Sequence, residues 1–123
     1  MKRVTGIGGI FFKANDRGRM IEWYQKHLGI VADPEHGTAF EWRDKDDPEK
    51  KGMTVWSVFK GESKYFDRPF MINYVVDDLD ALLEALKAEG VEIDPKRENH
   101  DFGKFAWIVD PEGNRIELWE PPK

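Results

Sequence analysis

Two stretches of the chain, one in each half, share the same order of apolar and polar positions. Each opens with an apolar run typical of a β-strand, 9–14 in the first half and 71–76 in the second. Each run ends in two polar residues, 15–16 or 77–78, whose side-chain oxygens can accept the free amides of a first helical turn. The pattern therefore predicts a strand followed by a helix in both halves.

The spacing of apolar residues gives the two helices. In the second half, four leucines recur at i, i+3, i+4 and i+7, and Gly90 supplies a left-handed stop: Leu79, Leu82, Leu83 and Leu86. The first half has a weaker stripe that ends at Gly29, formed by Met20, Ile21, Tyr24 and Leu28. We expect both helices to pack one face against a sheet.

Each helix is followed by a short apolar run and then by a hairpin pattern. The short runs are predicted strands at 30–32 and 91–93, and the hairpins pair 38–43 with 54–59 and 104–109 with 115–119. Both hairpin tips carry Asp-Pro-Glu followed by glycine, a combination suited to tight turns. The order strand, helix and three strands thus occurs twice.

This duplication predicts an α+β fold in a single domain, 1–123. Module one would span about 1–60, a linker about 61–69, and module two about 70–123. Two such βαβββ modules can bury their apolar faces as one curved, cup-like mixed sheet with the helices outside. A ferredoxin-like βαββαβ sandwich is the rival, but it needs only two strands between the helices, fewer than the sequence predicts.

Composition narrows the class of protein. The chain has 123 residues, no cysteine and a net charge of −5, so neither disulfides nor thiolate metal sites are expected, and a nucleic-acid partner is disfavoured. No stretch approaches the ~20 apolar residues that span a bilayer, and the glycine-broken N-terminal run does not resemble a signal peptide. We expect a cytoplasmic protein without a membrane partner.

Three segments together resemble the vicinal oxygen chelate superfamily, which includes glyoxalase I, fosfomycin-resistance proteins, extradiol dioxygenases and bleomycin-resistance proteins. They are EWYQKHLGI, VDDLDALLEALKAEGV and DPEGNRIELWEP, and the resemblance extends over nearly the whole chain. It implies a cup whose metalloenzyme members hold one divalent ion with side chains from the first and last strands of each module. In those members the cation binds neighbouring substrate oxygens and stabilises developing negative charge.

The resemblance assigns four ligand positions, and three of them carry no usual ligand here. The first strands place Gly9 and Met71 there, and the last strand of module one places Trp56 there, or Ser57 or Val55 if the register is offset by one. The last strand of module two keeps Glu117. Because catalytic divalent ions generally need about three protein ligands, we predict neither a metal site nor a cofactor, with a divalent metal as the alternative.

Glu117 is the candidate catalytic residue. Strand alternation puts its side chain opposite Ile116 and Leu118, so it should point into the cup as a general base or as an anchor for a cationic group. The alternative is a carboxylate that only pairs with a lysine or the backbone. By the same alternation, the candidate ligand-binding residues are Phe11, Lys13, Trp56, Met71, Asn73, Trp107 and Trp119, although each could simply fill the core.

The histidines fall outside the ligand positions. His27 is expected in the last turn of the first helix and His36 in a loop, both with structural roles. His100 is expected in the polar loop 98–101, where it could reach the mouth of the cup as an acid or base.

Three hypotheses about function follow. The first is a metal-independent small-molecule binding protein of the bleomycin-resistance type, a homodimer that holds an aromatic or apolar ligand in a cleft. The second is a metal-dependent lyase or dioxygenase with an irregular ligand set around Glu117. The third is a protein whose cup is filled with side chains and whose strands serve only for assembly with another subunit.

Overall fold

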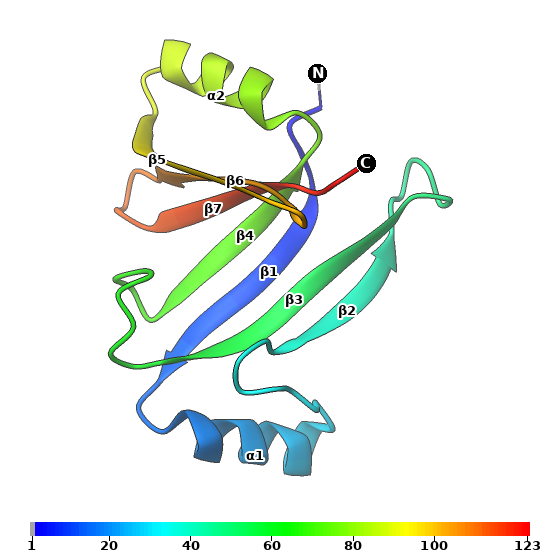
Figure 1. Ribbon diagram of the computed structural model, residues 1–123, viewed down its shortest axis with the longest axis vertical. Helices are drawn as coiled ribbons and strands as arrows, with labels where there is room; N and C mark the ends of the chain where they lie inside the picture. Colours follow the sequence, from blue (N-terminus) through cyan, green and yellow to red (C-terminus); the bar gives the residue numbers. More distant parts are fainter. Residues whose placement is uncertain (1) are drawn as a thin grey trace. The chain divides into compact units, whose positions relative to one another are not determined.

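The computed structural model, which describes residues 2–123, is an α+β protein with seven strands and two helices (Figure 1). Met1, the first residue of predicted module one, lies outside the described residues. The elements are β1 Val4–Ala14, α1 Arg17–Leu28, β2 Thr38–Arg43, β3 Lys51–Lys60, β4 Phe70–Val76, α2 Leu79–Ala88, β5 Glu92–His100, β6 Gly103–Val109 and β7 Arg115–Glu120. The predicted fold class is confirmed.

The strands follow the order β2-β3-β1-β4-β7-β6-β5 in one mixed sheet. β1 is parallel to β3 and β4 is parallel to β7, whereas the hairpins β2–β3, β5–β6 and β6–β7 are antiparallel. The chain forms two compact units, one comprising Ile72–Lys123 with the segment up to Gly8, the other Gly9–Met71. Three strands separate the helices in sequence, so the ferredoxin-like order is not present.

In the unit that contains α2, the predicted leucine stripe forms the core. Asp78 caps the helix by accepting a hydrogen bond from the Ala81 backbone N–H at 3.0 Å, and Gly90 after its end has a left-handed φ of 79°. The helix packs Leu79, Leu82 and Leu86 against the face of the sheet that carries Val76, Ala106 and Leu118.

The unit that contains α1 repeats this arrangement with fewer buried residues. Asp16 accepts a hydrogen bond from the Arg19 backbone N–H at 3.0 Å, and Gly29 ends the helix at φ 70°. The core under α1 consists of Ala14, Ile21, Trp56 and Val58. Both helix starts and both helix ends therefore form where the sequence predicts them.

The short strand predicted at 30–32 is wrong. Ile30 and Ala32 pack on the α1 core as a loop, and the chain then turns through an isolated bridge between Asp33 and Gly37. The apolar side chains that suggested a strand are buried by the helix rather than by a strand partner.

The loop predicted at 98–101 is also wrong, since His100 is the last residue of β5. β5 runs from Glu92 to His100 because a tight turn and Gly103, at φ 133°, bring His100 opposite Gly103 in the ladder with β6. Among residues 2–123, neither helix has the length and apolar character required to cross a bilayer.

Candidate functional site

The candidate site lies on the face of β4, β7, β6 and β5 opposite α2. Along β7, Ile116 and Leu118 pack in the α2 core, so the alternation of the strand directs Glu117 to the other face. Trp107 stands directly opposite Glu117 in β6, and Asn73 is its partner in β4. Strand register alone thus brings three of the predicted site residues together.

The carboxylate of Glu117 is buried and hydrogen-bonded through both oxygens. Asn73 Nδ2 donates to Oε1 at 2.6 Å, and Trp107 Nε1 donates to Oε2 at 3.0 Å. The three residues are 2% (Asn73), 0% (Trp107) and 3% (Glu117) exposed. Both donors are uncharged groups. In the low dielectric of the protein interior, their hydrogen bonds hold the Glu117 carboxylate in one orientation.

Two cations lie over the ring of Trp107. Lys96 Nζ is 5.3 Å from the ring centroid, and the Arg115 guanidinium carbon is 5.2 Å from it. Each cation has an acidic partner: Arg115 Nη1 lies 2.7 Å from Asp94 and Lys96 Nζ lies 3.0 Å from Glu98. The ring next to Glu117 therefore lies close to two cationic side chains, each of which has an acidic partner.

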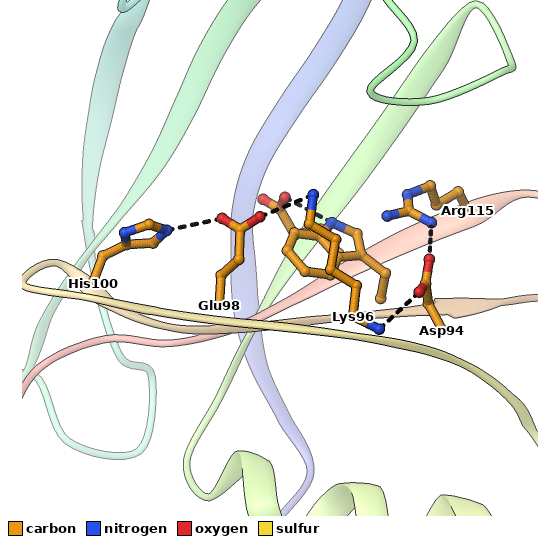
Figure 2. Close-up of polar contacts among 7 residues, drawn as sticks. Asp94, Lys96, Glu98, His100 and Arg115 are labelled. Atoms are coloured by element: carbon orange, nitrogen blue, oxygen red, sulfur yellow. Dashed lines mark hydrogen bonds and ion pairs between the residues drawn. The ribbon is translucent and has the colours of Figure 1, made fainter.

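These ion pairs form a row along β5, as Figure 2 shows, which His100 extends by donating to Glu98 at 2.8 Å. The hydrogen bond from Arg115, together with the Lys96 backbone N–H, holds the pKa of the Asp94 carboxyl below its ordinary value. The His100 imidazole and then Lys96 lower the pKa of Glu98. Both carboxyls are thus ionised at neutral pH, and the two cations keep their partners.

Aromatic rings surround the hairpin end of the same face. Trp119 stacks on Phe105 at 6.0 Å, and its Nε1 donates to the Phe102 backbone oxygen at 2.8 Å. His100 stacks on Phe102 at 4.8 Å, and Phe102 meets Phe105 edge-on at 5.6 Å. We call His100, Phe102, Phe105 and Trp119 the aromatic cluster. Its members Phe105 and Trp119 lie on β6 and β7, the strands that also carry Trp107 and Glu117.

Gly8 on β1 closes the site beside Asn73. A Cβ built on Gly8 would lie 2.3 Å from Asn73 Oδ1, 2.9 Å from Trp119 and 2.9 Å from Val75. Asn73 Oδ1 itself is buried and has no hydrogen-bond partner within the described residues. A side chain at this position would displace the amide that holds Glu117.

Of the other predicted site residues, Phe11 and Lys13 lie on β1 in the unit that contains α1. Phe11 contacts Phe59 at 5.5 Å between centroids, and Lys13 Nζ lies 5.1 Å from the ring centroid of Phe66. Phe66 is 1% exposed although it belongs to the segment predicted as a linker. The apolar pair Tyr65-Phe66 within this polar segment was the sequence signal that the segment packs against the rest of its unit and is not an exposed linker.

The prediction that Trp56 faces away from the helix is wrong. Its ring packs on Tyr24 at 5.0 Å and on Phe12 at 5.2 Å in the core beneath α1. The parallel register of β1 and β3 pairs Phe11 with Ser57, so Ser57 takes the face that was assigned to Trp56. Met71, which was also predicted to bind ligand, is fully buried in β4.

The residues around Glu117 do not fit the divalent metal that the fold implies. Asn73 Nδ2 and Trp107 Nε1, which hydrogen-bond to its oxygens, are donors, and neither an amide NH₂ nor an indole N–H can ligate a cation. Within residues 2–123, no three His, Cys, Asp or Glu side chains gather as a metal site would require. We therefore derive no metal chemistry from this site.

A sequence model of one protein family matches residues 6–118, under the description Glyoxalase/Bleomycin resistance protein/Dioxygenase superfamily. The chain belongs to this superfamily. The match confirms the resemblance seen in the three sequence segments and includes Glu117, Asn73 and Trp107. No curated protein sequence matches the chain.

Several solved structures share the fold of this chain at low sequence identity. Methylmalonyl-CoA epimerase from Mycobacterium tuberculosis is 22% identical, with a TM-score of 0.61 over 100% of this chain and 92% of that one. A variant of Streptomyces coelicolor methylmalonyl-CoA epimerase in complex with 2-nitronate-propionyl-CoA is 15% identical, with a TM-score of 0.68 over 98% and 99%.

The Mn(II)-bound glyoxalase from Novosphingobium aromaticivorans is 17% identical, with a TM-score of 0.62. It aligns with 98% of this chain, which spans only 40% of its length. At these identities the likeness shows the fold alone.

Lys96 and Arg115 were not among the predicted site residues. Arg115 alternates with Glu117 on β7, so its face could be deduced from sequence. Lys96 lies between the strand predicted at 91–93 and the loop predicted at 98–101, and the β5 register shifts between Ile93 and Arg97, where the Lys96 side chain lies over Trp107.

Proposed function

We propose that this member of the superfamily binds an organic small molecule without a resident metal, and that Glu117 anchors the ligand. The observation that carries the proposal is a buried carboxylate fixed by Asn73 and Trp107 on a sheet face that also bears aromatic rings. Binding sites for flat or apolar molecules combine such rings with a few polar groups of fixed orientation. The superfamily match places the chain among proteins whose description includes bleomycin resistance.

The arrangement favours binding over metal-dependent lyase or dioxygenase chemistry. A Lewis-acid reaction needs a cation with open coordination positions, and the hydrogen-bond donors around Glu117 use its oxygens instead. A carboxylate already held by two neutral donors can still accept a hydrogen bond from a ligand, since each oxygen has two lone pairs.

Isothermal titration against a panel of planar aromatic compounds tests this proposal. We expect at least one compound to bind with a Kd below about 1 mM. The Glu117→Gln variant should weaken that Kd by about tenfold or more, because the amide cannot present two acceptors to its neighbours and to the ligand. Elemental analysis of untreated protein should show no stoichiometric transition metal.

Glu84→Gln is the matched control, since Glu84 lies exposed on α2. It should leave the Kd unchanged. A panel without any binder, or a tightly held cation that is lost in the Glu117 variant, would end the proposal.

Homodimerisation and a cytoplasmic location are part of the proposal and stay predictions from the sequence. Light scattering coupled to size-exclusion chromatography measures the oligomeric state directly. The chain mass is 14.4 kDa, so the eluted species should have twice that mass if the protein is a dimer.

A further inference from the structure

We propose that Lys96 and Arg115 are positioning residues of this site, which hold Glu117 in place through Trp107. The chain of contacts is continuous: each cation lies over the indole ring, and the indole N–H donates to the Glu117 carboxylate. The inference rests on the proposed function only where ligand affinity is concerned. The positioning itself can be measured without a ligand.

The ring of Trp107 has little freedom to turn. It is fully buried, and Lys96 and Arg115 reach it from two different strands, β5 and β7. A cation over an aromatic face is attracted by the negative charge of that face, most strongly for tryptophan. A tilt of the ring that breaks the bond to Glu117 would also change its contacts with the two cations.

Two cations over one ring repel each other, so each needs a fixed counter-charge. Asp94 supplies it for Arg115 at 2.7 Å, and Glu98 supplies it for Lys96 at 3.0 Å (Figure 2). Asp94 also accepts the Lys96 backbone N–H at 2.9 Å, which fixes the turn of β5 before that side chain. The acidic residues thereby set the places of the cations, and the cations set the place of the ring.

The cations also act on the strength of the hydrogen bond. A positive charge over the ring draws electron density from the indole and makes its N–H a better donor. The Trp107 ring is fully buried, whereas the side chains of Lys96 and Arg115 are 51% and 25% exposed, so solvent screens the charge of Lys96 more than that of Arg115. Lys96 and Arg115 thus support Glu117 through Trp107.

NMR of the indole N–H of Trp107 tests the inference. In Lys96→Met and Arg115→Met, we expect the Trp107 Nε1–H resonance to move and its exchange with water to accelerate by about fivefold. Lys96→Arg and Arg115→Lys keep the positive charge, so the resonance position and the exchange rate should stay at their wild-type values. Lys60→Met, an exposed lysine at the end of β3, is the control and should change neither.

Trp107→Phe separates positioning from general electrostatics, because it keeps a ring for the cations and removes the N–H. In that background, Lys96→Met and Arg115→Met should have no further effect on the affinity of any ligand found by titration. An unchanged indole resonance in both single variants, or equal effects with and without the N–H, would overturn the inference. A shifted resonance in a protein that binds no compound would instead contradict the proposed function and leave the positioning role standing.

Discussion

Gly8→Ala should destabilise the protein, whereas the same change at Gly18 should stabilise it. The new Cβ at Gly8 would meet Asn73 Oδ1 at 2.3 Å and two carbon atoms at 2.9 Å, all of them in the packed site. We expect a loss of about 1–3 kcal/mol in the free energy of unfolding, the usual cost of overpacking. Asn73 would have to move, and its hydrogen bond to Glu117 would lengthen.

Gly18→Ala is the matched control. Gly18 lies in the first turn of α1, and its Cβ would meet nothing closer than Asp16 Oδ1 at 3.9 Å. Because alanine is the better helix former, we expect a gain of up to about 1 kcal/mol. Urea denaturation of the two variants measures both values. A Gly8→Ala variant as stable as the wild type would show that β1 does not approach Asn73 as described.

Asn73→Asp should be the most damaging single change at the site. It replaces the amide donor with a second carboxylate at the 2.6 Å contact to Glu117, where both side chains are almost fully buried. When both groups are ionised, the pair brings two like charges together and neither carboxylate can donate a hydrogen bond to the other. We expect a loss of about 3–5 kcal/mol, the range for an uncompensated buried charge.

The loss should depend on pH in one direction. When the solution is acidic enough for the two carboxylates to share a proton, one of them donates to the other and the variant regains stability. The difference from the wild type should therefore shrink as the pH falls and grow as it rises, which denaturation at several pH values measures. Asn99→Asp, at an exposed position in β5, should stay within about 0.5 kcal/mol. A variant that matches the wild type at neutral pH would contradict the hydrogen bond.

Much of the fold follows from local pattern. The leucines of α2, the capping residues Asp16 and Asp78, and the turn at Asp110 all form as the sequence predicts. Alternation along β7 is also local, which is why the face of Glu117 could be deduced from its neighbours. These features depend on residues within a few positions of one another.

Predictions from the sequence were wrong where the direction of a side chain depends on pairing between strands that are far apart in the chain. The face of Trp56 depends on the parallel register of β1 and β3, which no local pattern fixes. The place of Lys96 depends on a register shift in β5, and the run at 30–32 was apolar because a helix covers it. For the polar partners of Glu117, the sequence predicted that Asn73 and Trp107 share its face of the sheet, but it did not predict their hydrogen bonds to the carboxylate.

Side-chain NMR during a ligand titration tests most directly whether the ligand binds at Glu117. The five tryptophans give five indole N–H signals, which single Trp→Phe variants assign. A ligand anchored by Glu117 should shift the signals of Trp107 Nε1 and Asn73 Nδ2 and leave that of Trp23, which is 51% exposed on α1, unchanged. Saturable binding that moves Trp23 and leaves Trp107 and Asn73 in place would contradict it.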